Sequence, residues 1–211
     1  EKYWDKVAWT REFTTPFPHE RFQSFAGFDD HILDVGCGYG RTLQELWGRG
    51  YRNLAGVDLS TEMIRRGKDL CPHLDLRTAR GDELPFDDES QDAVLLFAVL
   101  TSIPQDRAQE DVIRESLRVL KPGGVFLVND FLLNSDERNL ARYRKDGGNH
   151  GPFGTFVLPD GGVMRHHDPV YLKKLLASLE EAIFEETFFR TMNGNASRGV
   201  LFVGRKPGQG D

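Results

Sequence analysis

Apolar and polar residues follow two different periods along the middle of the chain. Short, nearly continuous apolar runs have the length of strands buried on both faces of a parallel sheet, and they cover residues 32–35, 53–58 and 91–99. Between and after these runs, apolar side chains recur three and four positions apart, as in amphipathic helices, over residues 41–47, 61–70 and 105–120. This alternation predicts a doubly wound α/β fold.

The remaining pattern completes the sheet. Two more strands are expected at 74–80 and 124–131, with Pro122-Gly123-Gly124 ending the preceding helix. Beyond Asp168-Pro169, a typical helix start, two strands over 183–190 and 198–205 are separated by Asn193-Gly194-Asn195, which favours an antiparallel hairpin. We therefore predict one domain over 1–211, with a mostly parallel seven-stranded sheet and a C-terminal antiparallel hairpin.

Two segments stand outside this alternation. Residues 1–30 are dense in aromatic side chains without strand periodicity, which indicates short helices that cover the core or also close over a ligand. Residues 134–167 are rich in glycine and contain a hairpin pattern around Pro159 to Gly162. We interpret the second segment as a lid inserted after the fifth strand, between a core at 31–131 and a final helix and strands at 168–206.

Charge and composition narrow the function. The formal net charge is −6 and the pI is near 5.6, which argues against nucleic acid as a partner. No apolar run approaches the length of a membrane span and the first residues are not typical of a signal peptide, so we expect a cytoplasmic protein without a membrane partner. The chain begins at Glu1 without an initiator Met, so N-terminal residues are expected to be missing. Its oligomeric state is left open.

A glycine-rich turn follows the first strand. Asp34-Val-Gly-Cys-Gly-Tyr-Gly40 has glycine at alternate positions, which lets the backbone turn sharply and approach a ligand before the next helix begins. Asp58 lies 22 residues beyond Gly36, at the end of the second strand. That spacing suits a carboxylate that accepts hydrogen bonds from the ribose of an adenosine ligand held on the turn.

These features and others in the same order resemble the class I S-adenosylmethionine-dependent methyltransferases, particularly the small-molecule group called type 11. The matching pieces are Asp34 to Gly40, Asp58-Leu-Ser, Gly81-Asp82, Leu84-Pro-Phe-Asp-Asp-Glu-Ser-Gln-Asp-Ala-Val94 and Leu117-Arg-Val-Leu-Lys-Pro-Gly-Gly124. The resemblance covers about 32–131. It implies a Rossmann-like methyltransferase fold and an enzyme that transfers a methyl group from S-adenosyl-L-methionine to a small-molecule acceptor, leaving S-adenosyl-L-homocysteine.

The resemblance also implies cofactor contacts. Asp58 resembles the ribose ligand, Asp82 the acceptor for the adenine amino group, and Phe97 with Ala98 the segment beside the methionyl part. The full set of cofactor-binding residues implied is Asp34, Gly36, Cys37, Gly38, Gly40, Asp58, Leu59, Met63, Asp82, Glu83, Phe97 and Ala98. No metal is expected, because His166 and His167 are adjacent and no carboxylate spacing supports them.

The lid supplies the candidates for acceptor chemistry. Methyl transfer from a sulfonium needs in-line placement and exclusion of water, and a base helps where the acceptor must lose a proton. One of His150, His166 and His167 is the candidate base, and ordinary packing is the alternative for each. Candidate substrate contacts are Tyr143, Phe153, Phe156 and Arg165.

The same lid is locally basic. Arg138, Arg142, Arg144, Lys145 and Arg165 either form a solvated helix face or bind an acceptor that carries a carboxylate or phosphate.

Two other functions stay open at this point. One is a nicotinamide-dependent oxidoreductase, although the glycines are spaced Gly36-x-Gly38-x-Gly40 and not Gly-x-Gly-x-x-Gly. The other is a regulatory protein that binds the cofactor without turnover. The acceptor atom, which could be O, N, S or C, is not predicted.

Overall fold

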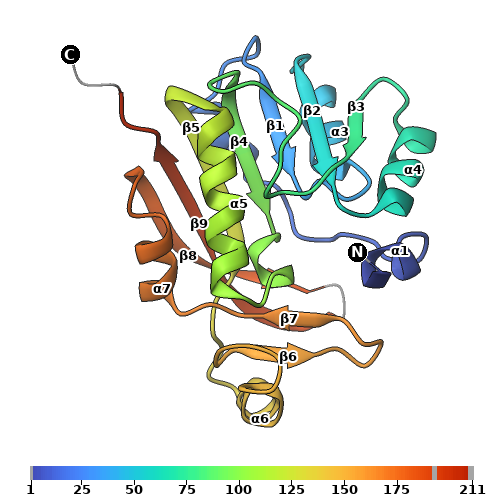
Figure 1. Ribbon diagram of the computed structural model, residues 1–211, viewed down its shortest axis with the longest axis vertical. Helices are drawn as coiled ribbons and strands as arrows, with labels where there is room; N and C mark the ends of the chain where they lie inside the picture. The colour runs from blue at the N-terminus through green and yellow to red at the C-terminus, as the bar shows by residue number, and fades with distance from the viewer. Residues whose placement is uncertain (1, 192–193, 209–211) are drawn as a thin grey trace.

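The computed structural model describes residues 2–191 and 194–208, and a seven-stranded sheet forms its centre (Figure 1). The strand order is β3-β2-β1-β4-β5-β9-β8, with β3 to β5 parallel and β9 and β8 antiparallel. The strands are β1 Ile32–Val35, β2 Leu54–Asp58, β3 Asp75–Thr78, β4 Gln91–Phe97, β5 Leu120–Phe131, β8 Glu180–Arg190 and β9 Ala196–Arg205. The predicted doubly wound sheet and its antiparallel C-terminal pair are confirmed.

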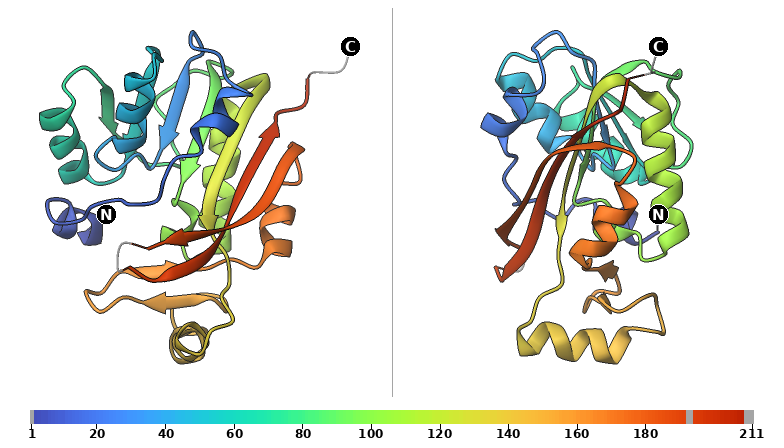
Figure 2. Two further views of the ribbon diagram at one scale, coloured as in Figure 1. Left: turned by 180° about the vertical axis from the view of Figure 1, so that it is seen from behind. Right: turned by 90° about the vertical axis from the view of Figure 1, so that its left-hand side faces the viewer.

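Helices cover both faces of the sheet (Figure 2). Helices α3 (Arg41–Gly48) and α4 (Thr61–Leu70) pack on one face through Leu43, Leu46 and Ile64. Helices α5 (Asp106–Val119) and α7 (Pro169–Leu175) pack on the other through a cluster that includes Val112, Ile113 and Leu172. Strands buried on both faces explain why β1 and β4 are almost wholly apolar.

Local sequence signals set the helix starts as predicted. The Ser60 hydroxyl accepts a hydrogen bond from Met63 N at 3.1 Å and so caps α4. The Asp168 carboxylate accepts from Val170 N at 2.7 Å, and Pro169 occupies the first turn of α7.

The junction between α5 and β5 differs from the prediction. The helix ends at Val119 and the strand begins at Leu120, not at Gly124. Leu120 pairs with Gln91, after which the register shifts before the regular ladder of Ala93 and Val125. Gly123, with φ of +76°, lies in this irregular start, so the Pro-Gly-Gly sequence shapes the strand entry as well as following the helix.

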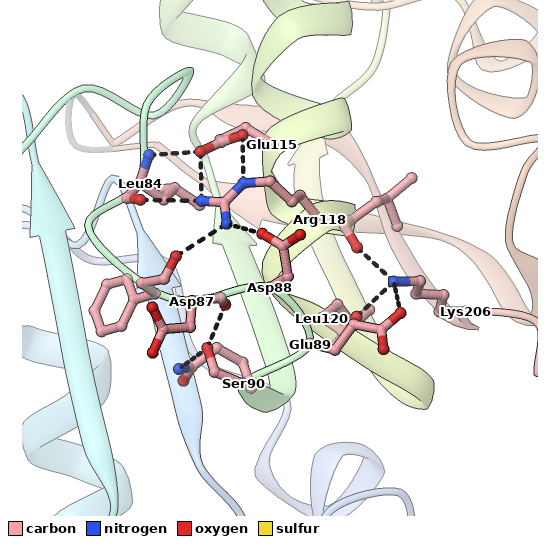
Figure 3. A network of polar contacts seen from close by, with 12 residues as sticks. Leu84, Asp87, Asp88, Glu89, Ser90, Glu115, Arg118, Leu120 and Lys206 are labelled. Carbon is pink, nitrogen blue, oxygen red and sulfur yellow. Dashed lines mark hydrogen bonds and ion pairs between the residues drawn. The ribbon is translucent and has the colours of Figure 1, made fainter.

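Arg118 of α5 organises the loop between β3 and β4 (Figure 3). Its guanidinium donates to the carbonyl of Leu84 at 3.1 Å and pairs with Asp88 at 2.6 Å and Glu115 at 2.7 Å. The Glu115 carboxylate in turn accepts from Leu84 N at 2.8 Å. These ion pairs raise the pKa of Arg118. Residues of the two sequence motifs at 84–90 and 117–124 therefore connect the β3–β4 loop to helix α5.

The insertion and residues 2–15 lie at the end of the sheet toward which the parallel strands point, whereas residues 19–23 pack on one face of the sheet through Phe22 (Figures 1 and 2). The N-terminal segment contains α1 (Lys2–Val7) and α2 (His19–Gln23), the short helices expected there. The insertion contains α6 (Glu137–Asp146) and the two-stranded pair β6 (Thr155–Val157) and β7 (Val163–Arg165), which confirms the hairpin. A short 3-10 turn, η1 (Leu100–Ser102), follows β4 and contacts β7.

The turn between β8 and β9 is only partly described. Asn193 lies outside the described residues, while Gly194 has a φ of +77° and its N–H donates to Thr191 O at 2.8 Å. Across the described part of the chain, no helix has the length and apolar character needed to cross a membrane.

Candidate functional site

A cavity of about 340 Å³ opens at the carboxyl ends of β1, β2 and β4. The order of the strands reverses between β1 and β4, which is where open α/β sheets bind ligands. We distinguish two parts of this cavity. The loop end is lined by Asp34 to Gly38, Arg41, Asp58, Leu59, Met63 and Phe97 to Val99, with Phe13 against Gly38; the insertion end is lined by Trp4, Arg11, Arg138, Arg142, Phe156, Leu158, Met164 and His166.

Two glycines at the loop end have no space for a side chain. Gly36 and Gly38 have φ of +76° and +57°, a region that L side chains rarely adopt. A Cβ on Gly36 would meet Val99 Cγ2 at 2.6 Å, and one on Gly38 would meet Phe13 Cε2 at 2.4 Å. Ala98 also has a positive φ, of 58°, at the end of β4. Such strained positions cluster where a backbone must approach a ligand.

Two carboxylates face this end, and burial perturbs both. Asp58 accepts hydrogen bonds from Gly38 N and Ser60 N, each at 2.8 Å, while burial raises its pKa. Asp34 is 1% exposed and its Oδ1 has no hydrogen-bond partner among the described residues. Burial raises the pKa of Asp34 to about 8, with nearby Arg41 opposing the rise and Asp58 adding to it. A buried carboxyl without partners is suited to receive a donor or cation from a ligand.

Three of the predicted cofactor residues do not line the cavity. The Asp82 carboxylate pairs with Arg80 at 2.7 Å, which lowers its pKa, and Glu83 lies beside it in a short bridge to Arg80. Gly81 lines the cavity in their place. Gly40 begins α3 and packs near Leu76, so its glycine character serves the start of the helix. The other predicted cofactor residues all line the loop end.

His166 is the predicted histidine that the structure brings to the cavity. Its Nδ1 lies 2.6 Å from Tyr143 Oη and 3.2 Å from Asn134 Nδ2. The Tyr143 oxygen accepts from Asn134 N at 3.3 Å, which leaves its own proton to donate to Nδ1. This network assigns the proton of the neutral ring to Nε2. Burial, with Arg142, His167 and Arg138 nearby, lowers the pKa of His166 well below its usual value.

The other two predicted histidines do not line the cavity. His150 is exposed and does not line the cavity. His167 is buried beneath it, where its Nδ1 donates to the Phe131 carbonyl at 3.2 Å and its Nε2 accepts from Gln109 Nε2 at 2.9 Å. Burial and the neighbouring Arg165 lower the pKa of His167 to about 3. It is a structural histidine.

Of the four predicted substrate contacts, Phe156 lines the cavity. Tyr143 is 1% exposed and lies behind His166. Arg165 donates to the Pro104 carbonyl at 2.9 Å and pairs with Asp106, so it fixes β7 to the core. Phe153 is 56% exposed and lies outside the lining. The positions of these four side chains depend on how the insertion folds, which no local sequence pattern specifies.

The N-terminal segment contributes lining residues that the sequence reasoning did not single out. Phe13 stacks on Tyr39 with ring centroids 5.0 Å apart, and Arg66 of α4 donates to the carbonyls of Ala8 and Arg11 at 2.8 and 2.7 Å. Arg11 pairs with Asp160 in the β6–β7 turn. The N-terminal segment and the insertion thus meet over the cavity. The high aromatic content of residues 1–30 was the feature of the sequence that could have indicated this contribution to the lining.

Comparison with known proteins identifies the fold. A family model described as a methyltransferase domain matches residues 33–128. The chain superposes on a SAM-dependent methyltransferase from Methanosarcina mazei with a TM-score of 0.87 and 26% identity, over 93% of this chain and 100% of that one. Residues 33–128 are thus similar to a methyltransferase domain, and the chain shares the fold of a SAM-dependent methyltransferase. S-adenosylmethionine is the cofactor of such methyltransferases, as the resemblance implied.

Other methyltransferases are similar over part of their length. The chain is 32% identical over 139 residues to 27-O-demethylrifamycin SV methyltransferase of Amycolatopsis mediterranei, covering 62% of this chain and 50% of that protein. It is 28% identical over 155 residues to demethylmenaquinone methyltransferase of Tropheryma whipplei, covering 72% and 59%. The chain thus spans about half to three fifths of these methyltransferases.

Among residues 2–191 and 194–208, no group of three or more His, Cys, Asp or Glu side chains is arranged to hold a metal ion.

Proposed function

We propose that this chain catalyses transfer of the methyl group of S-adenosylmethionine to a small-molecule acceptor bound at the insertion end. The observation that carries the proposal is the loop end, where two glycines without room for a Cβ adjoin the carboxylates of Asp34 and Asp58. The rifamycin and menaquinone methyltransferases named above support a small-molecule acceptor, because their own acceptors are small molecules.

The residues of the loop end fit S-adenosylmethionine. Each oxygen of Asp58 accepts one backbone hydrogen bond, which leaves lone pairs for ribose hydroxyls. The unpartnered Oδ1 of Asp34 would hold a donor of the cationic methionyl part. When bound, this cofactor supplies a methyl group on a sulfonium, which is already activated for displacement. The protein must then align the acceptor and exclude water.

The N-terminal segment and the insertion provide that exclusion. Phe13 and Trp4 cover the cavity from one side, and Phe156, Leu158 and Met164 line it from the other. We propose that these residues position the acceptor. The insertion end contributes arginines and no carboxylate to the lining, which favours an anionic acceptor.

A protein base is not part of the proposed mechanism. The Nδ1 of His166 is occupied by the Tyr143 and Asn134 donors, so the ring presents Nε2–H. The structure therefore favours His166 as a hydrogen-bond donor over the predicted general base. This arrangement fits an acceptor that is already ionised when it binds. It also fits an acceptor whose nucleophilic atom carries no proton to remove.

Calorimetry with S-adenosylmethionine, S-adenosylhomocysteine and NADH tests the cofactor. We expect the first two to bind and NADH not to bind; absence of binding by both adenosyl compounds would contradict the proposal. Release of S-adenosylhomocysteine in the presence of an acceptor library then separates an enzyme from a regulatory protein that binds without turnover. The relatives reported above are methyltransferases and give the oxidoreductase alternative no support.

A further inference from the structure

We propose that Arg142, Arg138 and the Nε2–H of His166 form an oxyanion site at the insertion end, which binds a carboxylate or phosphate group of the acceptor. The inference rests on the proposed function, because it assigns a chemical class to the acceptor of that same cavity. The three side chains all line the cavity, and the site is formed where helix α6 meets the end of β7.

Arg142 is the centre of this site. Its guanidinium lies over the Phe156 ring, with Cζ 3.4 Å from the ring centroid, and burial lowers its pKa. Its Nε is buried without a hydrogen-bond partner, and no carboxylate pairs with the guanidinium in the part of the chain that the structure describes. The Tyr143 side chain and the Asp136 carboxylate, which forms no ion pair with Arg142, only partly offset the burial of this cation, so an anionic ligand reduces the cost that remains.

Arg138 extends the positive charge along the same face of α6. It lies four residues before Arg142, so their side chains are neighbours one helical turn apart. Its carboxylate partner, Asp136, is 3.8 Å away and both side chains are about half exposed, so this ion pair is weak. Two like charges on adjacent turns repel each other unless an anion lies between them.

The other two cations in the lining have their own partners. Arg11 pairs with Asp160, and Arg41 pairs with Glu45 and donates to the Thr15 carbonyl at 2.7 Å. The unpaired charge is therefore concentrated on Arg142, beside the weakly paired Arg138.

His166 adds a neutral donor to these cations. Tyr143 and Asn134 both donate to its Nδ1, and its Nε2 has no partner among the described residues. The site thus offers donors from three side chains and no acceptor, which is the pattern expected for an oxyanion. A guanidinium that stacks on an aromatic ring while its edge stays available is suited to bidentate binding of carboxylate or phosphate.

Binding of matched anionic and neutral probes tests the site. The full chain is first loaded with S-adenosylhomocysteine, then titrated calorimetrically with benzoate and phenyl phosphate and with their neutral counterparts benzamide and phenol. We expect at least one anion to bind about tenfold or more tightly than its neutral counterpart, as for other hydrogen bonds to charged groups. The ratio of the two anion affinities shows whether the site favours carboxylate or phosphate.

Three variants and one control variant locate the effect. Arg142→Gln should weaken anion binding by about tenfold to a hundredfold, and Arg142→Lys should weaken it less because the charge is kept. Arg144→Gln is the matched control, since Arg144 is an exposed arginine of the same helix outside the cavity lining. It should leave the anion affinity unchanged. His166→Phe, which removes the Nε2 donor, should weaken anion binding without altering the affinity for S-adenosylhomocysteine.

Each outcome separates the two proposals. The titration with S-adenosylhomocysteine measures binding at the cofactor site. The probe titrations are repeated without S-adenosylhomocysteine, so that anion binding is measured independently of cofactor binding. Failure to load contradicts the proposed function. Equal binding of charged and neutral probes, no binding of any anion at millimolar concentration, or a charge preference that survives Arg142→Gln overturns the oxyanion site.

Discussion

The two parts of the cavity differ in how they are built. The loop end is formed by three neighbouring strands and the turns that follow them, and it places the acidic side chains of Asp34 and Asp58 near Arg41. The insertion end is assembled from two segments far apart in the sequence, residues 2–17 and 134–167, and its charged residues are arginines. One end has the chemistry to hold a cationic donor, and the other has the chemistry to hold an anion. A single cavity can thus separate two ligands of opposite charge.

The largest effect is expected from Gly38→Ala. The new Cβ would lie 2.4 Å from Phe13 Cε2, at a φ of +57° that disfavours any side chain. We expect affinity for S-adenosylmethionine to fall by two orders of magnitude or more, measured by calorimetry. Gly123→Ala is the control, because Gly123 has a φ of +76° with nothing within 4 Å of its Cβ position. It should cost about 1–2 kcal/mol of stability and leave the affinity unchanged.

Asp58→Asn should have the next largest effect. An amide cannot accept from both Gly38 N and Ser60 N, so one of these donors loses its partner and the negative charge is lost. Affinity for S-adenosylmethionine should fall about tenfold to a hundredfold. Asp92 also accepts a backbone hydrogen bond, from His31 N at 2.9 Å, but lies outside the cavity lining. If Asp92→Asn lowered the affinity for S-adenosylmethionine equally, the effect of Asp58→Asn could not be assigned to the loop end.

The pH dependence of stability should report on Asp34. Its pKa is about 8 in the folded chain against 3.8 for the ordinary side chain, so the folded state binds the extra proton between these values. Unfolding then becomes easier as pH rises from about 4 to about 8, by at most about 1.4 kcal/mol per pH unit from this group. Asp34→Asn should remove that part of the slope in thermal melts. An unchanged slope would show that Asp34 is ionised in the folded protein.

The smallest effect is expected where the two outlying segments meet. Arg11→Gln breaks the ion pair with Asp160, which is partly exposed and contributes about 0–1 kcal/mol. We expect a severalfold increase in KM for the acceptor and little change in affinity for S-adenosylmethionine. Arg114→Gln, which breaks a surface pair with Asp111 at 2.6 Å, should change neither value. A larger effect on the cofactor than on the acceptor would contradict the assignment of the two ends.

The same comparison explains what the sequence could predict. The sheet and its helices follow from short-range patterns, and Asp34, Gly36, Gly38 and Asp58 lie at strand ends or in the turn that follows, whose conformation is set locally. Asp82 shows the limit of this reasoning, because its motif position is matched but its carboxylate pairs with Arg80.

The insertion end could not be predicted in the same way. His166 and Tyr143 are 23 residues apart, and their contact depends on how α6 packs against the β6–β7 pair. Which of the three predicted histidines lines the cavity depends on burial and tertiary packing, which no spacing in the sequence records.

Phe13 has one further consequence. Its ring packs against both Gly38 and Tyr39, so a residue of the N-terminal segment forms part of the surface around the cofactor loop. We expect exchange of spent for fresh cofactor to involve movement of this segment. We expect product release to compete with chemistry for control of the turnover rate, with S-adenosylhomocysteine acting as a slowly departing inhibitor.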